Sequence, residues 1–509
     1  MAVNQRKAGA VLSYVSLAVN AAVAFAYVPI LLSSLSVSEY GVYELIGSMI
    51  AYLGVMDMGL STTLSRYFVY INETQGEEGL ERLLSVSFKV YVVLTLIALA
   101  VCGCLYLGLD PLFGASFTVE ELGLAREMMA LVALNCVIVL PGNWFLAIVN
   151  ANEDFVFARS VSIVKYLLQV VSVLLVLNWH AGAMGVLACQ VAANAIAVLS
   201  YVVRARQLTE VRVRLLVWDK VLVSSLFTFS FFILLNMVFD QVFWKTGQVV
   251  LGAVCDAAAV AVYGIACKII TAAYMQASVG LTSVFLPKLT LISARTREMG
   301  QINDLFVRIG RLQAILVWGI CGGFVVLGQE FIYLWAGPDF GEAYTATVIL
   351  MIGLSISLVQ NLGLSVLQAK NQMAFRAAVY TLLAVLDVVI SIPVAATFGV
   401  TGCAVVAAVL LLLGTGPIMN WYYRSRVGID VARFFRAVLP LLAPVVITSA
   451  AVWVASCAVA LPYSWGDLVA KACLFALVYL VVLWALFLNE YEKGLVRGVA
   501  RKISRKKAG

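Results

Sequence analysis

Residues 84–108 read LSVSFKVYVVLTLIALAVCGCLYLG, an apolar run that contains a single charge, Lys89. About 20 apolar residues in an α-helix cross the hydrocarbon core of a bilayer, and a helix satisfies every backbone polar group of such a run internally. Similar runs recur along the 509 residues, of which 63% are hydrophobic and 12% charged, with a mean hydropathy of +1.01. This composition excludes a soluble enzyme, a nucleic-acid-binding domain and a disordered scaffold. We therefore expect an all-α polytopic membrane protein.

Fourteen runs have the length of a transmembrane helix. They are approximately residues 10–32, 42–71, 84–108, 122–148, 155–177, 183–203, 221–250, 258–286, 309–327, 343–368, 374–396, 402–422, 437–457 and 468–488. The second, seventh and eighth are near 30 residues long, which predicts tilted helices or protruding ends. Pro29, Pro141 and Pro393 are expected to kink or break their spans.

The distribution of charge between alternate loops predicts the orientation. With the N-terminus in the cytoplasm, the seven outer loops contain no Lys or Arg, while the inner segments hold most of the 34 basic residues. The outer loops contain nine acids: Glu39, Asp110, Glu120, Glu121, Asp256, Glu330, Asp339, Glu342 and Asp467. The positive-inside rule then places both termini in the cytoplasm. It also accounts for the net charge of +7 without a nucleic-acid partner.

An internal repeat predicts how the helices are grouped. Val42-Tyr43 recurs as Val262-Tyr263 at an offset of about 220, and a strongly basic loop, 204–220, lies near the middle of the chain. We expect two six-helix lobes related by an axis along the membrane normal, followed by two extra helices. The predicted divisions are an N-lobe with helices one to six (1–203), a basic cytoplasmic loop (204–220), a C-lobe with helices seven to twelve (221–422), helices thirteen and fourteen (423–488) and a basic cytoplasmic tail (489–509).

Signatures of soluble enzymes are missing. The ten cysteines are scattered without a CxxC pair, so we interpret them as packing residues rather than a disulfide framework or a metal site. The one histidine, His180, follows Trp179 in a short outer loop and is expected at the membrane interface. There is no P-loop. The sequence therefore predicts no catalytic residue, no metal and no cofactor, although a membrane-embedded glycan polymerase or acyltransferase stays open as an alternative.

Charged residues inside the spans are the informative candidates, because a charge in hydrocarbon usually faces a partner or a wet cavity. Those near span ends, where long side chains reach water, are expected to be interfacial: Glu44, Arg126, Glu127, Arg311 and Lys471. The cations predicted to bind substrate are Arg66, Lys89, Lys165, Lys245 and Lys268. The acids predicted to couple transport to an ion gradient are Asp57, Asp240 and Asp387. For each, a structural ion pair or a hydrogen-bonded side chain between helices is the alternative.

The opening of the chain resembles a known family. Residues 28–32 (VPILL), 37–45 (VSEYGVYEL) and 57–67 (DMGLSTTLSRY) are similar to the start of the bacterial polysaccharide flippases, the Wzx-like family. That family is grouped with the MATE exporters and the lipid II flippases in one superfamily. Residues 150–155 (NANEDF) and 368–372 (QAKNQ) resemble its small polar inner loops, at an offset of about 218.

The resemblance implies a two-lobed transporter of the bacterial inner membrane with a central cationic cavity, into which Lys165, Lys245 and Lys268 are expected to face. Its substrate would be a polyprenyl-diphosphate-linked oligosaccharide, moved from the cytoplasmic to the outer leaflet for surface polysaccharide synthesis. Buried Lys and Arg match a diphosphate. The implied partners are this lipid-linked oligosaccharide, the lipid bilayer, H⁺ or Na⁺, and the polysaccharide polymerase machinery. A cation-coupled MATE-type exporter of small molecules and a lipid II type flippase are the alternatives.

Overall fold

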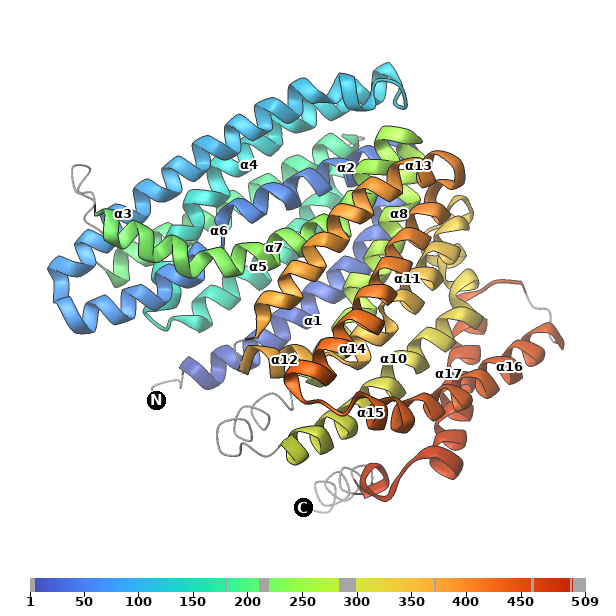
Figure 1. Ribbon diagram of the computed structural model, residues 1–509. Helices are drawn as coiled ribbons and strands as arrows, with labels where there is room; N and C mark the ends of the chain where they lie inside the picture. The colour runs from blue at the N-terminus through green and yellow to red at the C-terminus, as the bar shows by residue number, and fades with distance from the viewer. Residues whose placement is uncertain are drawn as a thin grey trace, which may run out of the picture. The chain divides into compact units, whose positions relative to one another are not determined.

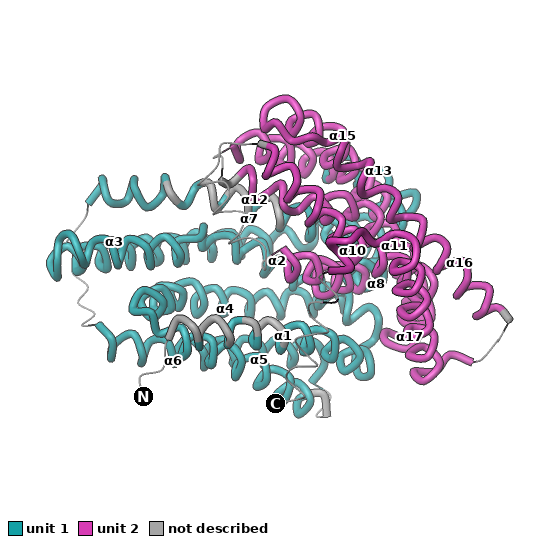
Figure 2. The backbone as a smooth tube through the Cα atoms, turned by 90° about the horizontal axis from the view of Figure 1, so that it is seen from below, with its two compact units in different colours: residues 1–264, 388–403 teal, residues 265–387, 404–509 magenta. Residues whose placement is uncertain are grey.

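The computed structural model describes residues 5–178, 181–209, 219–282, 299–369, 372–458, 462–494 and 497, and within them the regular structure is helical without strands (Figure 1). The chain divides into two compact units (Figure 2). Unit 1 comprises Met1–Gly264 and Val388–Cys403, and unit 2 comprises Ile265–Asp387 and Ala404–Gly509. Ten helices of the described part are long and apolar enough to cross a membrane. The predicted all-α polytopic fold is confirmed.

Unit 1 is built from the first seven long helices. They are α1 (Gln5–Leu32), α2 (Val37–Gly54), α3 (Leu60–Phe113), α4 (Val119–Ala151), α5 (Phe155–Asn178), α6 (Gly182–Leu208) and α7 (Lys220–Val254), with the short 3-10 helix η1 (Val55–Asp57) and most of α8 (Ala257–Ile269). Helix α4 packs on α3 and α6, and α1 packs on α5. Helix α7 packs on α2 and α3, so it belongs to this unit although the sequence places it in the second lobe. The predicted lobe boundaries themselves stay a prediction.

Unit 2 contains the later helices. They are η2 (Ile270–Tyr274), α10 (Met299–Trp335), η3 (Pro338–Phe340), α11 (Glu342–Val359), α12 (Leu362–Ala369), α13 (Met373–Leu413), η4 (Gly414–Ile418), α14 (Met419–Tyr422), η5 (Tyr423–Val427), α15 (Val431–Val438), η6 (Leu439–Leu441), α16 (Leu442–Ala458), α17 (Trp465–Val482) and η7 (Leu483–Phe487). Residues 388–403 of α13 are counted with unit 1. Helix α10 packs on α11, α15, α16 and α17 and is the centre of the unit.

The fourteen predicted spans fall on helices of the described part, except residues 283–286 at the end of the eighth span, which lie outside it. Helices α3 and α13 each cover parts of two predicted spans, and a left-handed glycine marks the turn between them. Gly76 in α3 has φ +64° and Gly399 in α13 has φ +56°. A left-handed residue interrupts an α-helix, and glycine adopts this conformation without steric cost. Gly76 lies between the second and third predicted spans, and Gly399 between the eleventh and twelfth.

The prolines do not break their helices. Pro29, Pro141 and Pro393 each lie inside a helix that continues through them, and a kink at these positions stays a prediction. The second predicted span, expected to be continuous, is instead interrupted by η1 and by two left-handed residues, Met58 (φ 53°) and Gly59 (φ 67°). A proline removes a single backbone donor, which a membrane helix tolerates, whereas two consecutive left-handed residues end the helical hydrogen-bond pattern.

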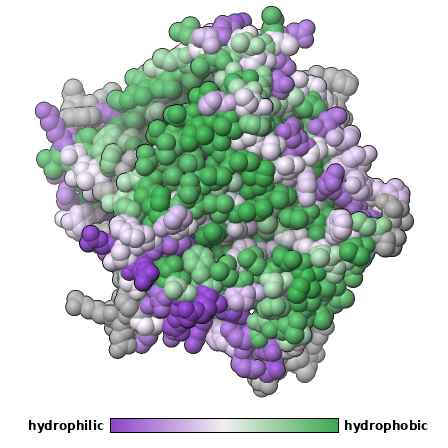
Figure 3. Space-filling view, turned by 45° about the vertical axis from the view of Figure 1, so that its right-hand side comes forward, coloured by the Kyte–Doolittle hydropathy of each residue, from purple (hydrophilic) through white to green (hydrophobic). Residues whose placement is uncertain are grey.

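Hydrophobic side chains cover broad patches of the surface (Figure 3). Leu107 is 75% exposed and Leu486 is 72% exposed, although both lie in apolar helices. Apolar surface of this extent, on helices long enough to cross a bilayer, is typical of proteins embedded in lipid. The chain is therefore an integral membrane protein.

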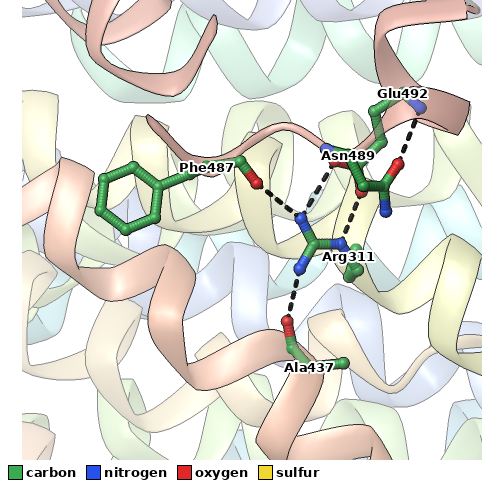
Figure 4. Close-up of polar contacts among 5 residues, drawn as sticks. All are labelled: Arg311, Ala437, Phe487, Asn489 and Glu492. Carbon is green, nitrogen blue, oxygen red and sulfur yellow. Dashed lines mark hydrogen bonds and ion pairs between the residues drawn. The ribbon is translucent and has the colours of Figure 1, made fainter. Parts of the chain in front are cut away.

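Two ion pairs fasten α17 and the segment after it to α10. Arg311 donates from Nε to Glu492 Oε1 at 2.6 Å, and its remaining nitrogens donate to the carbonyl oxygens of Ala437 (2.7 Å) and Phe487 (2.9 Å) (Figure 4). Lys471 donates to Glu330 at 3.0 Å and also pairs with Asp467. These side chains are neutralised inside the protein. The expectation that Arg311 and Lys471 reach water at the interface was therefore wrong.

Candidate functional site

The break after α2 carries a buried carboxyl group. Asp57 is the last residue of η1 and is 8% exposed. Its Oδ1 accepts hydrogen bonds from the Tyr91 hydroxyl at 3.0 Å and from Asn143 Nδ2 at 3.1 Å. Tyr91 comes from the second half of α3 and Asn143 from α4. Two neutral donors from neighbouring helices thus offset the desolvation of a carboxyl at an unwound point of a membrane span.

A second polar cluster lies between α2 and α7. Gln248 is fully buried, and its Nε2 donates to Glu44 Oε2 at 3.4 Å. Its Oε1 accepts from the Ser48 hydroxyl and from Lys245 Nζ, the latter at 3.5 Å. The Gln248 amide therefore links the Glu44 carboxylate to the Lys245 ammonium group. Glu44 is 5% exposed, so its predicted interfacial position was wrong, because α7 covers it.

Helix α7 is hydrogen-bonded on both sides of the break. Before it, the Tyr52 hydroxyl lies 2.7 Å from Thr246 Oγ1, and after it, Thr63 Oγ1 lies 2.8 Å from Ser230 Oγ. Side-chain hydrogen bonds between membrane helices contribute on average about 0.6 kcal/mol each. Polar side chains therefore line the contact of α7 with α2 and α3 inside unit 1.

The other predicted cations of unit 1 are not members of these two clusters, and they differ in how far they are buried. Lys165 on α5 is half-buried, and its Nζ lies 5.1 Å from the centroid of the Tyr166 ring. It pairs with no carboxylate in the part of the chain that the structure describes. Lys89 on α3 is half-buried and Arg66 on α3 is exposed. Lys245 is therefore connected to Glu44 through the Gln248 side chain.

The remaining predicted residues lie in unit 2 or outside the described side chains. Lys268 at the end of α8 is half-buried, and Asp387 on α13 is 3% exposed. Both belong to unit 2, and their predicted roles stay predictions. Asp240 lies in α7, but its side chain is outside the described part of the chain, as are His180 and most of the basic tail.

Unit 2 contains a hydrogen bond that corresponds to one in unit 1. Asn361, at the break between α11 and α12, donates to Thr282 Oγ1 at 3.4 Å. Asn143 and Asn361 are 218 residues apart, the offset at which the polar inner loops repeat. Asn143 contacts a residue of the second predicted span, and Asn361 contacts a residue of the eighth. The internal repeat itself stays a prediction.

Three residues of the site were not predicted from the sequence. Glu44 was assigned to the interface, and Gln248 and Tyr91 were not singled out. Gln248 could have been found from its spacing to Lys245, because residues three apart lie on one face of a helix. Groups of three or more potential metal ligands are missing from the described residues.

Comparison with known proteins gives a family and a fold. A family model described as polysaccharide biosynthesis protein matches residues 7–293, more than half of the chain. No curated protein matches the chain in sequence.

Solved structures match over most of the chain. The structure of the lipid II flippase MurJ in an inward closed conformation aligns with a TM-score of 0.74 and 13% identity, over 93% of this chain and 97% of that one. An inward-facing multidrug resistance MATE family transporter of the MOP superfamily aligns with a TM-score of 0.64 and 14% identity, over 80% and 94%. The MATE multidrug transporter DinF-BH in complex with R6G aligns with a TM-score of 0.56 and 15% identity, over 84% and 96%. The predicted similarity in fold to the lipid II flippases and the MATE exporters is confirmed.

Proposed function

Since the chain belongs to the polysaccharide biosynthesis protein family, we propose that it is a flippase for a polyprenyl-diphosphate-linked oligosaccharide. It moves this lipid from the cytoplasmic to the outer leaflet of the bacterial inner membrane by alternating access. Both termini lie in the cytoplasm, and the outer leaflet product passes to a polysaccharide polymerase.

The observation that carries the proposal is the polar interior of unit 1. Asp57, Glu44 and Lys245 are ionisable groups within helices whose outer surfaces are apolar. Such groups are costly in a bilayer and normally belong to a substrate or ion pathway. A transporter of an anionic headgroup that is driven by an ion gradient needs donors for phosphate and an acid that binds the ion.

Lysines are suited to bind the diphosphate. The Lys245 ammonium group makes one long hydrogen bond to an amide oxygen, at 3.5 Å. A phosphate oxygen, which carries charge, is a stronger acceptor than an amide oxygen and would displace it. Lys165 is held only over an aromatic ring. Lys268, Lys89 and Arg66 complete the proposed set of binding cations.

Asp57 is the proposed coupling acid of unit 1. Its donors, Tyr91 and Asn143, are neutral, so the carboxyl can take up a proton or Na⁺ without first breaking an ion pair. Uptake would change the hydrogen bonds that hold α3 and α4 at the break. Asp240 and Asp387 are the other coupling candidates.

The test is flipping in liposomes with variants of the binding cations. Purified protein is reconstituted with a polyprenyl-diphosphate oligosaccharide, and an external glycosidase reports the sugar that reaches the outer leaflet. Lys165→Ala, Lys245→Ala and Lys268→Ala should each slow flipping at least tenfold, because a hydrogen bond to a charged group contributes about 1.5–3 kcal/mol. Lys220→Ala, which removes an exposed cation at the start of α7, should leave the rate unchanged.

Three outcomes would contradict the proposal. Wild-type rates in all three cavity variants would remove these lysines from the pathway. Equal losses in the Lys220→Ala control would show that overall charge, not the site, controls the rate. Transport of organic cations in place of the lipid-linked sugar would support the small-molecule exporter instead.

A further inference from the structure

A small polar pocket lies within unit 2, at the break between α11 and α12. It encloses about 300 Å³ of empty space, its mouth included. Its lining comes from the end of α11, the break itself, the start of α13, and the irregular segments η4, α14 and η5. Both η4 and η5 are π-helical turns, a form that is frequent at functional sites.

Arg376 is the only charged residue of the lining. It is half-buried, and its guanidinium carbon lies 4.4 Å from the centroid of the Tyr380 ring. Among the described residues it pairs with no carboxylate, in contrast to Arg311 in the same unit. An arginine that is stacked on a ring and has no acidic partner keeps its fork of N–H donors free for an anion.

Uncharged polar groups complete the lining. The Tyr423 hydroxyl packs against Gly363, and glycine leaves room for it there, because a Cβ at this position would lie 2.6 Å from the hydroxyl oxygen. Gln360 donates to Asn420 Oδ1 at 2.8 Å, which holds the chain rigid just before the break. Asn361 makes only a long hydrogen bond, at 3.4 Å, and can turn its amide toward a ligand.

We propose that this pocket binds a phosphoryl group, with Arg376 as its principal donor. The single charge of the pocket is positive, and a guanidinium group matches phosphate in geometry. Under the proposed function, on which this inference rests, the phosphate belongs to the diphosphate of the arriving substrate. Arg376 lies three residues after the start of α13 at Met373, at the predicted cytoplasmic end, where that headgroup enters.

The experiment measures binding of geranyl diphosphate, a short prenyl diphosphate, to the full chain in nanodiscs of zwitterionic lipid. Arg376→Gln should weaken the affinity at least tenfold, which corresponds to about 1.4 kcal/mol. Arg376→Lys should recover part of the lost affinity, since lysine keeps the positive charge but lacks the paired N–H donors of the guanidinium group. The matched control is Arg436→Gln, which removes an exposed arginine of α15, outside the pocket, and should bind as the wild type does. Inorganic pyrophosphate should compete, since the headgroup alone is recognised.

The outcomes separate this inference from the proposed function. Unchanged affinity in folded Arg376→Gln protein overturns the pocket, whatever the flipping assay shows. Lost affinity in that variant, combined with a wild-type protein that flips no lipid-linked sugar, supports the pocket and overturns the proposed function. If phosphatidylglycerol added to the nanodiscs displaces geranyl diphosphate completely, the phosphate comes from ordinary lipid, and the link to the substrate is overturned.

Discussion

Replacing Arg311 by methionine tests the packing of the C-terminal helices. The substitution leaves the Glu492 carboxylate, whose side chain is 2% exposed, without its cation, and it removes the donor to two carbonyl oxygens. Breaking a buried pair from one side costs about 3–5 kcal/mol. The backbone N–H of Asn489 still donates to Glu492 at 2.9 Å, so we expect the lower end of that range, about 3 kcal/mol. The free energy of unfolding is measured by titration with SDS in mixed micelles.

A double variant separates the ion pair from the loss of volume. Arg311→Met combined with Glu492→Leu leaves no charge unpaired, so it should recover at least half of the stability that Arg311→Met loses. The matched control is Arg433→Met, because Arg433 pairs with Asp304 on the surface, with side chains 54% and 48% exposed. That change should cost under about 1 kcal/mol. A double variant as unstable as the sum of its two single changes would refute the reasoning.

Three glycine substitutions test the packing and the break of the second predicted span by the same unfolding titration. Gly41→Ala should destabilise unit 1 by about 2–3 kcal/mol, because the added Cβ would lie 1.8 Å from the backbone oxygen of Ala257. The control is Gly47→Ala on the same helix, whose Cβ meets nothing within 4 Å, so it should be neutral or stabilising. Equal effects of the two substitutions would contradict the contact between α2 and α8. Gly59→Ala should cost roughly 1–2 kcal/mol, since Gly59 has φ +67°, and a stabilising effect would mean that the helix is continuous there.

The positions of the spans could be predicted from the sequence, because each span is a run of apolar residues. The breaks within spans could not be predicted in this way. The interruption at Asp57 depends on left-handed backbone at Met58 and Gly59, and hydropathy contains no information on backbone dihedral angles. Pro29, Pro141 and Pro393, the prolines singled out from the sequence, lie within continuous helices.

The candidate site was predicted in part. Asp57 and Lys245 were found from their depth in the spans, but their partners come from helices that are distant in sequence. Glu44 was placed at the interface because it lies near a span end, whereas α7 covers it. Arg376 lies near an inner end, where the excess of positive charge already explains an arginine, so only the pocket around it reveals another use.

The most direct test of the account is the sidedness of the lipid itself. Liposomes with unmodified protein and matched empty liposomes receive the same polyprenyl-diphosphate oligosaccharide, and the fraction that an external glycosidase can reach is followed with and without a proton or sodium gradient. We predict that the protein brings the inner pool to the enzyme within the time in which empty liposomes keep it protected. Equal protection in both preparations under every gradient would contradict the account.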